Sequence, residues 1–252
     1  MHSTLAETKN WFDQGGSAYA RYRPEYPPAV AAFLASIAPD TVQALDVGCG
    51  TGQLTVQLAE NFRRVSGIDP SEDQINHATP KQNVTYHCAP AEELPLPNNS
   101  ASLVTAAQAA HWFDLPRFYG EVRRVATPDA ILALISYGVL RLEGDLGARF
   151  ERFYWHEIGP YWPPERQLVD SGYATIEFPF DEIGSPLIAI HLEWSLEDLL
   201  GYISTWSSVR NARDSGRDEL LQGFAADIAN LWGERTARRP ITWPVSMRVG
   251  RL

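Results

Sequence analysis

Residues 44–55 read ALDVGCGTGQLT, and this stretch decides the fold expected for the whole chain. An apolar run ends in an aspartate, glycines occupy every second position from 48 to 52, and the pattern resumes as a helix. Glycine has no Cβ, so its backbone can turn tightly and come close to another group. In open α/β sheets, ligands bind beyond the carboxyl ends of the strands, which is where this turn would lie. The stretch therefore predicts a strand, a binding turn and a helix in succession.

Strand-like and helix-like segments alternate from about residue 42 to residue 138. Such alternation predicts an α/β fold with a parallel sheet and right-handed crossovers. The expected strands cover 42–47, 64–70, 83–89, 102–109 and 130–138, and the expected helices cover 53–62, 71–78 and 115–126.

The segments on either side are expected to form caps on a single domain, 1–252, whose cofactor-binding core is 41–138. Residues 1–40 would be an N-terminal cap over the cofactor, and residues 139–212 an aromatic-rich insert and substrate cap. Residues 213–252 would supply a C-terminal helix and the last strand. In these segments the patterns predict strands at 174–180, 187–194 and 241–250 and helices at 27–39, 195–209 and 217–232, the helix at 195 capped by Ser195 and Asp198.

Composition limits the function classes. The formal net charge of −10 argues against a basic face for nucleic acid. Cys49 and Cys88 are the only cysteines, too few for a disulfide framework and without the spacing of a Cys/His metal site. No segment approaches the roughly 20 apolar residues of a membrane span, and residues 1–10 lack the pattern of a signal peptide. We expect a cytoplasmic protein without a metal and without a nucleic-acid, membrane or evident protein partner.

The glycine positions also discriminate between nucleotide ligands. A dinucleotide fingerprint, GxGxxG, would place its third glycine at position 53, where this chain has Gln53. A P-loop is excluded because no Gly-Lys-Ser/Thr follows. Asp69 ends the second expected strand, where a carboxylate can accept hydrogen bonds from both hydroxyls of a ribose. The residues together indicate a nucleoside-containing ligand without a bound pyrophosphate.

Three stretches, LDVGCGTGQLT, GIDPSEDQI and APAEELPLPNNSASLVTAAQAAHWFD, resemble the successive motifs of class I S-adenosylmethionine-dependent methyltransferases of the type 11 kind. The resemblance covers roughly residues 40–138. The stretches YARYRPEYP and AAHWFD are similar to the small-molecule branch that includes trans-aconitate methyltransferase. The resemblance implies a Rossmann-like sheet of seven mostly parallel strands with helices on both faces. It also implies S-adenosylmethionine as cofactor and S-adenosylhomocysteine as product.

The resemblance further implies which residues would hold the cofactor. Many relatives carry an acidic residue two places before Glu92, where this chain has Pro90. The implied residues are Asp46 and the backbone of Gly48, Cys49 and Gly50 for the methionine ammonium, Asp69 for the ribose, Pro70, Ala91 and Glu92 for the adenine, Gln108 for the methionyl portion and Arg21 for the cofactor carboxylate.

The acceptor chemistry stays open at this point. A carboxylate nucleophile is ionised near pH 7 and needs no general base, whereas a hydroxyl or amine acceptor usually does. His111, with Asp114 three residues on, could be the catalytic base, contact an acceptor carboxylate, or only pack at the strand end. The expected substrate-binding residues are Tyr19, Tyr22, Arg23, His111, Trp112, Trp155 and Trp206.

The sequence favours transfer of a methyl group to a small-molecule acceptor, with O-methylation of a carboxylate-bearing metabolite as the preferred reaction. The alternatives are an NAD(P)-dependent oxidoreductase and a non-catalytic nucleoside-binding module.

Overall fold

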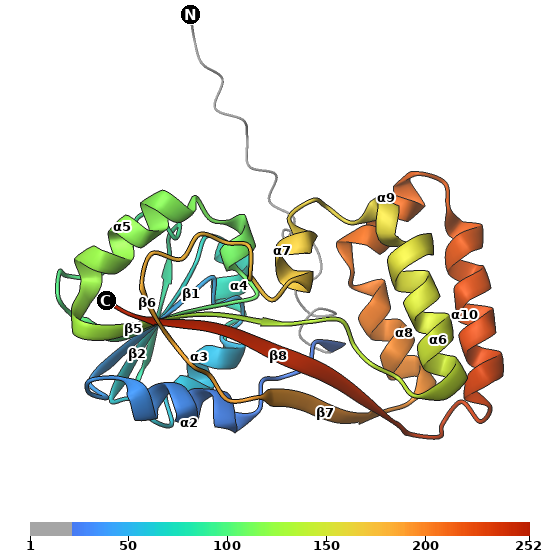
Figure 1. Cartoon of the computed structure of the whole chain (residues 1–252), viewed down its shortest axis with the longest axis horizontal. Coiled ribbons are helices and arrows are strands. Elements are labelled where there is room, and N and C mark those ends of the chain that lie inside the picture. Colours follow the sequence, from blue (N-terminus) through green and yellow to red (C-terminus); the bar gives the residue numbers. More distant parts are fainter. Residues whose placement is uncertain (1–21) are drawn as a thin grey trace, which may run out of the picture.

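The computed structural model describes residues 22–252 (Figure 1). Of the residues expected to bind cofactor or substrate, Tyr19 and Arg21 lie outside the described residues, as does most of the expected N-terminal cap. The described chain has an α/β part, which carries the glycine turn, and a group of helices beside it.

Five parallel strands form the centre of the sheet. They are β1 (Gln43–Val47), β2 (Arg64–Asp69), β3 (Val84–Cys88), β4 (Ala101–Ala107) and β5 (Ala126–Tyr137), in the order β3-β2-β1-β4-β5. Every residue of β1 is buried, as expected for a strand covered on both faces. The predicted parallel sheet is confirmed. Its strand order reverses between β1 and β4, so their carboxyl ends flank the switch point where such sheets bind ligands.

The antiparallel strand β8 (Arg239–Arg251) extends the sheet beyond β5. Val245 of β8 pairs with β5 on one edge and with β7 (Ile188–Trp194) on the other. The short strand β6 (Asp181–Ile183) pairs with the last residues of β8, also on the edge away from β5. Because β6 and β7 follow one another along one edge of β8, the sheet formed by residues 22–252 has eight strands but is seven positions wide. The implied seven-strand architecture is confirmed.

Helices cover both faces of this sheet. Helices α2 (Pro28–Ile37) and α3 (Gln53–Leu58) bury apolar side chains with Leu103 on one face. Helix α5 (Leu115–Val125) buries Phe118 and its neighbours on the opposite face, with Val104. Successive strand residues point to opposite faces, which is why Leu103 and Val104 belong to different clusters.

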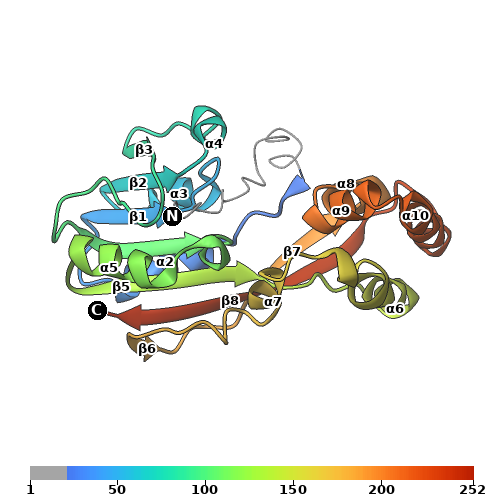
Figure 2. The same ribbon diagram turned by 90° about the horizontal axis from the view of Figure 1, so that it is seen from above.

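A helical lobe lies at one end of the sheet (Figures 1 and 2). It consists of α6 (Gly144–Arg152), α8 (Leu196–Ser204), α9 (Ser207–Asp214) and α10 (Asp218–Trp232), and a π-helical turn η2 (Phe153–Glu157) extends α6. The long strand β8, together with β7, runs from the α/β part to this lobe. The interior of the helical lobe is aromatic and includes Phe150, Phe153, Tyr154, Trp206 and Phe224.

The predicted strand over 174–180 is wrong. Its backbone hydrogen bonds close locally, from the N–H of Ile176 to Tyr173 and from that of Phe180 to Phe178. The ring of Phe178 and the Cβ of Phe180 lie against Gly250, and both rings lie edge-on to the ring of Tyr119. The apolar alternation therefore reflects side chains that pack on β8 and α5 without strand pairing. Pairing with β8 begins only at residue 181.

The single helix predicted over 195–209 is two helices, α8 and α9. The capping box of Ser195 and Asp198 is present at the start of α8, as predicted. The chain leaves the helical conformation at Trp206, whose φ is −74° and ψ is 142°. Trp206 is 3% exposed and contacts Tyr202 edge-on, so burial of this large ring accompanies the turn between the helices.

Candidate functional site

The glycine turn joins β1 to α3. The N–H groups of Gly48 and Cys49 both donate to the carbonyl of Ile68, which ties the turn to β2. Gly48, Gly50 and Gly52 have φ values of 71°, 54° and 87°, in the left-handed region that favours glycine. The turn is therefore fixed in position directly beyond the carboxyl ends of β1 and β2.

The reason that glycine is required differs among the three positions of the turn. A Cβ on Gly48 would lie 2.3 Å from the Cβ of Ala109, and one on Gly52 would lie 2.1 Å from the hydroxyl oxygen of Tyr86. Packing within the protein thus accounts for these two positions. A Cβ on Gly50 would meet only Oε1 of Gln74, at 3.6 Å. Packing does not explain Gly50, whose φ of 54° favours glycine and whose Cβ position leaves room for a ligand.

Asp46, the last acidic residue before the turn, is 1% exposed. The hydroxyl of Thr55 donates to its Oδ2 at 2.7 Å, and the hydroxyl of Thr105 donates to its Oδ1 at 2.8 Å. Burial raises the pKa of Asp46 to about 6, against the lowering effect of these hydrogen bonds. Asp46 therefore carries a negative charge at neutral pH that a positively charged ligand group would stabilise.

Asp69 connects two backbone segments around the expected ribose position. Its Oδ2 accepts from the N–H of Gly50 and its Oδ1 from the N–H of Ser71, both at 2.9 Å. The hydroxyl of Ser71, in turn, accepts from the N–H of Gln74 and caps α4 (Glu72–Asn76), as predicted. Each carboxylate oxygen can accept a second hydrogen bond, so Asp69 is available to a hydroxyl-bearing ligand as well.

A buried amide oxygen beside these groups tests whether a nucleoside fits here. Gln74 is 6% exposed, and no described residue donates a hydrogen bond to its Oε1. A buried acceptor without a donor is costly, so this atom fits a site that receives a donor from outside the protein. It lies next to Gly50, whose N–H is bound to Asp69. A ribose hydroxyl would supply the missing donor at this place.

The expected adenine-binding residues follow two neighbouring strands, Pro70 after β2 and Ala91 and Glu92 after β3. Ala91 is buried, whereas Pro70 is exposed at the end of β2. Glu92 accepts a hydrogen bond from the N–H of Asp114 at 2.8 Å. Asp114 itself caps α5 by accepting from the N–H of Arg117. The structure thus assigns Asp114 to the start of a helix, and the partner of His111 is a different residue.

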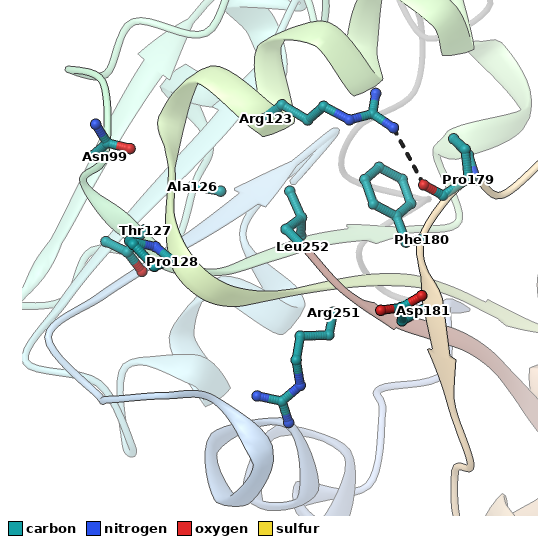
Figure 3. Close-up of a pocket in the computed structure, with 10 residues that line it drawn as sticks. All are labelled: Asn99, Arg123, Ala126, Thr127, Pro128, Pro179, Phe180, Asp181, Arg251 and Leu252. Carbon is teal, nitrogen blue, oxygen red and sulfur yellow. Dashed lines mark hydrogen bonds between the residues drawn. The ribbon is translucent and has the colours of Figure 1, made fainter.

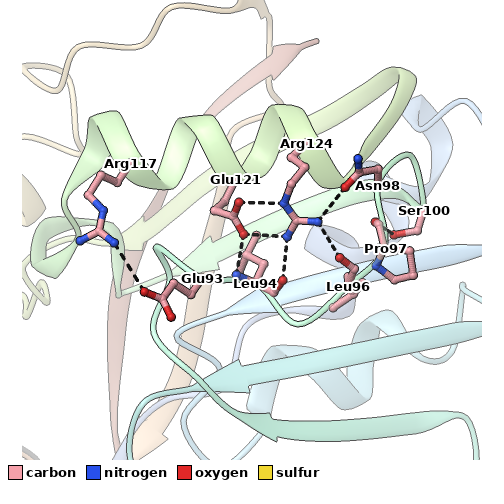
Figure 4. A network of polar contacts seen from close by, with 9 residues as sticks. All are labelled: Glu93, Leu94, Leu96, Pro97, Asn98, Ser100, Arg117, Glu121 and Arg124. Carbon is pink, nitrogen blue, oxygen red and sulfur yellow. Dashed lines mark hydrogen bonds and ion pairs between the residues drawn. The ribbon is translucent and has the colours of Figure 1, made fainter.

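Arg124 and Glu121 of α5 hold the loop that follows Ala91 (Figure 4). Arg124 donates to the carbonyls of Leu94 and Leu96, each at 2.7 Å, and Glu121 accepts from the N–H of Leu94 at 2.7 Å. The two side chains also form an ion pair at 2.7 Å. The loop is therefore fixed to α5 by charge-assisted hydrogen bonds.

The segment after β4 carries the candidate catalytic residue. Gln108 has a φ of 53°, uncommon for a residue other than glycine, and its side-chain Nε2 donates to the carbonyl of Tyr137. His111 lies in the short helix η1 (Ala110–Trp112), with its ring centroid 4.7 Å from that of Trp112. Backbone strain at the end of β4 thus accompanies the side chains expected to face the reaction.

Nδ1 of His111 lies 2.9 Å from the hydroxyl oxygen of Tyr173. Burial is the main cause, and the positive charge of Arg166 the second, that together lower the pKa of His111 to about 3. Burial also raises the pKa of Tyr173, so its phenol keeps its proton and needs an acceptor. A neutral imidazole that accepts this proton at Nδ1 carries its own ring proton on Nε2.

The remaining expected substrate residues are spread over the two parts. Tyr22 packs where a Cβ on Gly201 of α8 would be. Arg23 donates to the hydroxyl of Tyr137 at 3.3 Å and lies 5.4 Å from the ring of Tyr202. These residues connect the α/β part with the helical lobe. In contrast, Trp155 is 52% exposed and Trp206 belongs to the lobe interior, so the structure does not gather either of them around His111.

Four residues that the sequence analysis did not select belong to the site. They are Gln74 and Tyr86 beside the glycine turn and Arg166 and Tyr173 beside His111. The spacing of Arg166 and Asp170 is the helical ion-pair spacing i, i+4 and could have been noticed. The other three carry no local sequence signal.

A pocket of about 420 Å³ lies at the opposite edge of the sheet (Figure 3). Ala126, at the start of β5, and Arg251, at the end of antiparallel β8, both line it. It is therefore at the amino ends of the parallel strands, away from the glycine turn. Arg123 beside it is engaged by the carbonyl of Pro179 and the ring of Phe180.

Two findings concern residues 22–252 as a whole. No group of three or more His, Cys, Asp or Glu side chains in that range is arranged to hold a metal ion. No helix in that range is long and apolar enough to cross a membrane.

Comparison with known proteins assigns the family. A family described as a methyltransferase domain matches residues 45–134. A candidate methyltransferase of Dictyostelium discoideum is 35% identical over 228 residues, which cover 88% of this chain and 87% of that protein. A candidate type II methyltransferase from Anaeromyxobacter dehalogenans has a solved structure with a TM-score of 0.85 and 43% identity, covering 91% of this chain and 98% of that one.

A more distant relative is the malonyl-[acyl-carrier protein] O-methyltransferase of Serratia marcescens. It is 23% identical over 184 residues, covering 72% of this chain and 66% of that protein. The oxidoreductase and the non-catalytic module are not favoured by these comparisons. The chain belongs to the S-adenosylmethionine-dependent methyltransferases.

Proposed function

We propose that this methyltransferase O-methylates a carboxylate of a small-molecule acceptor, in the manner of the branch that includes trans-aconitate methyltransferase. The observation that carries the proposal is the pairing of His111 with the buried hydroxyl of Tyr173. With the phenol donating to Nδ1, Nε2 of His111 would be a hydrogen-bond donor and not a base. An acceptor that must first lose a proton is poorly served by such a residue, whereas a carboxylate arrives ionised.

The cofactor would be held by the groups around the glycine turn. Asp69 and Oε1 of Gln74 would receive the ribose hydroxyls, and Asp46 would balance the ammonium charge of the methionine portion. Pro70, Ala91 and Glu92 would border the adenine, with Gln108 beside the methionyl portion. When bound, S-adenosylmethionine supplies an activated methyl group, whose transfer to a carboxylate forms an O–C bond, breaks a C–S bond and releases no proton.

The protein's contribution would be positioning and exclusion of water. Nε2–H of His111 would donate to the acceptor carboxylate, and Trp112 would cover it. Tyr22 and Arg23 would border the site between the two parts. The name of the Serratia relative, an O-methyltransferase acting on malonyl-[acyl-carrier protein], agrees with transfer to oxygen.

The role of His111 can be tested with two substitutions that differ in donor ability. His111→Gln keeps a side-chain N–H, and His111→Ala does not. We expect the glutamine variant to retain at least about tenfold more kcat/KM toward a carboxylate acceptor, in line with one charge-assisted hydrogen bond. Its pH profile should match that of the wild type. Equal losses in both variants, together with the disappearance of an acidic limb of the profile, would instead identify His111 as a base.

The cofactor site is tested by Asp69→Ala, with Ser71→Ala as the matched control. Loss of charge-assisted hydrogen bonds at Asp69 should weaken S-adenosylhomocysteine binding by at least about 1.5 kcal/mol in calorimetry. Ser71→Ala removes the cap of α4 and should lower stability by about 1 kcal/mol, with little effect on affinity. Unchanged affinity in Asp69→Ala would remove Asp69 from the ribose site.

A further inference from the structure

Arg166 is a charged residue in the interior between the helical lobe and the α/β part. It begins α7 (Arg166–Asp170), which lies between the two in Figure 1, and its side chain is 15% exposed. Its Nε donates to the hydroxyl of Tyr154 and to Oδ1 of Asp170, both at 2.9 Å. Within residues 22–252, Nε is thus the one nitrogen through which Arg166 is hydrogen-bonded to the protein.

The other end of the guanidinium is not used by the protein. Among residues 22–252, no acceptor is hydrogen-bonded to Nη1 or Nη2 of Arg166. Its flat face is covered by the ring of Trp162, 4.7 Å from the ring centroid, and Tyr154 lies near it as well. An arginine has five N–H donors, so four of them remain for a ligand.

Arg149 gives a comparison within the same fold, and its buried Nη1 also has no hydrogen-bond partner among the described residues. Its side chain is 13% exposed, similar to Arg166, but it pairs with Asp227 through Nε and with Glu157 through Nη2. Two carboxylates from the protein neutralise Arg149. Arg166 has one carboxylate partner, Asp170, which binds Nε and not the paired Nη atoms.

The guanidinium is also close to the candidate catalytic residue. Helix α7 packs against η1, which carries His111. After burial, the charge of Arg166 is the second cause that lowers the pKa of His111. The electrostatic field of Arg166 therefore reaches the position where the acceptor would react. In a chain with a formal net charge of −10, a buried cation with free donors favours an anionic ligand there.

We propose that Nη1 and Nη2 of Arg166 bind a carboxylate of the methyl acceptor other than the one that is methylated. The proposal rests on the proposed function and adds the substrate class: a dicarboxylate or tricarboxylate. A planar guanidinium fork matches a carboxylate with two parallel hydrogen bonds, which occupy lone pairs on both oxygens. A carboxylate held in this way is a poor nucleophile, so the reacting group is a second carboxylate, placed at His111.

Binding measurements test this assignment apart from catalysis. Calorimetry in the presence of S-adenosylhomocysteine would use the linear diacids from malonate to adipate and tricarballylate, each compared with its monoamide. We expect at least one diacid or triacid to bind the wild type about tenfold or more tightly than its monoamide. Arg166→Met and Arg166→Lys should both abolish this preference, because lysine lacks the fork. The matched control Arg149→Lys should keep it.

Asp170→Asn supplies a test that does not depend on the folding of the Arg166 variants. Removing the competing negative charge should tighten diacid binding by about threefold or more, while asparagine can still accept from Nε of Arg166. Circular dichroism and thermal unfolding would accompany every variant. Weaker or unchanged diacid binding in Asp170→Asn would contradict the proposal, as would failure of every acid to bind the wild type.

The outcomes separate this inference from the proposed function. If wild type forms methyl esters but Arg166→Lys keeps the same KM for the diacid, the assignment of Arg166 is wrong and the function stands. If diacids bind through Arg166 but no methyl ester forms, the anion site stands and the proposed reaction is wrong.

Discussion

The hydroxyl of Tyr173 and Nδ1 of His111, 62 positions apart in the sequence, lie within 2.9 Å of each other. Tyr173 is fully buried and has a φ of 63°, so a strained backbone conformation places its phenol. This contact joins the segment after α7 to the end of β4. A phenol that donates to Nδ1 leaves the imidazole proton on Nε2, and the proposed chemistry depends on that tautomer.

Tyr173→Phe removes the phenol proton and leaves Nδ1 of His111 without a donor. We expect kcat to fall about tenfold, with a smaller change in the KM of the acceptor, because the ring is no longer held in one tautomer. Long-range proton–nitrogen NMR should find the Nε2–H tautomer in the wild type and a mixture in the variant. Tyr119→Phe is the control, since Tyr119 is also buried but donates to the carbonyl of Glu177. A pure Nδ1–H tautomer in the wild type would contradict the assignment.

Asp46→Asn should make the protein more stable and a poorer enzyme. The pKa of Asp46 is raised to about 6 in the folded protein from an ordinary 3.8, so the folded state binds its proton more tightly than the unfolded state. The stability that the protonated carboxyl of Asp46 gives to the folded state is fully present below about pH 4 and is lost as the pH rises through 6. At pH 8 the neutral variant should therefore gain up to about 3 kcal/mol, and little at pH 4.

The same substitution removes the charge opposite the cofactor's ammonium group. Binding of S-adenosylhomocysteine should weaken about tenfold in Asp46→Asn, measured by calorimetry at pH 8. A variant that is less stable than wild type at pH 8 would show that Thr55 and Thr105 need the charge for their hydrogen bonds.

Gly52→Ala tests the packing explanation for the third glycine of the turn. The new Cβ would lie 2.1 Å from the hydroxyl oxygen and 2.9 Å from the ring of Tyr86, so we expect a loss of about 2–4 kcal/mol in urea unfolding. Gly216→Ala is the control for backbone strain alone, because Gly216 has a φ of 70° and open space around its Cβ position. It should lose only about 1 kcal/mol.

Adding Tyr86→Ala to Gly52→Ala separates the cost of the clash with Tyr86 from the cost of backbone strain at position 52. Relief of the clash should return part of the stability lost in Gly52→Ala, which a double-mutant cycle measures. Additive losses would mean that Tyr86 is not what excludes a side chain at position 52.

Arg124→Met should loosen the loop that follows Ala91. Arg124 donates to two loop carbonyls and to Glu121, so we expect the free energy of unfolding to fall by about 2 kcal/mol and cofactor affinity to fall by about threefold. Hydrogen bonds from Arg124 are the main cause that lowers the pKa of Glu121. The stability from the pair with Glu121 is present above the ordinary pKa of 4.5 and is lost as the pH falls. The difference between wild type and variant should therefore narrow in acid, and the part that comes from the two loop carbonyls should remain.

Arg117→Met is the matched control for this prediction. Arg117 lies on the same helix but forms only an exposed pair with Glu93, at 3.7 Å. We expect a change within about 0.5 kcal/mol. A loss as large as that of Arg124→Met would assign the effect to the net charge of α5 and not to the loop contacts.

The sequence predicts the central sheet well because each strand there is bounded by its own turn signal. Gly48 ends the first strand, and Ser71 caps the helix after Asp69 as expected. Periodicity fails where apolar residues pack against something other than a neighbouring strand. Phe178 and Phe180 alternate like a strand but cover Gly250 and Tyr119. Gly250 and Tyr119 are distant in the sequence, so this packing cannot be predicted from the local pattern of residues.

The candidate site was predictable in part, for a related reason. Asp46, Gly50 and Asp69 are close in sequence to the turn that organises them, and the structure brings them together. Tyr173 and Arg166 reach His111 only through the fold, and the residues between them carry no repeating pattern. Trp155 and Trp206 were selected for residue type alone, and type does not distinguish an exposed ring or a lobe interior from a binding surface.

The position of the transferred methyl group tests the central claim most directly. S-adenosylmethionine labelled with CD3 would be incubated with the wild-type protein and the diacids and triacids that bind it, and the product analysed by NMR and mass spectrometry. The account predicts a trideuteromethyl ester that mild alkali hydrolyses to labelled methanol. A label on nitrogen or carbon, or no transfer to any bound acid in a protein that binds S-adenosylhomocysteine, would contradict it.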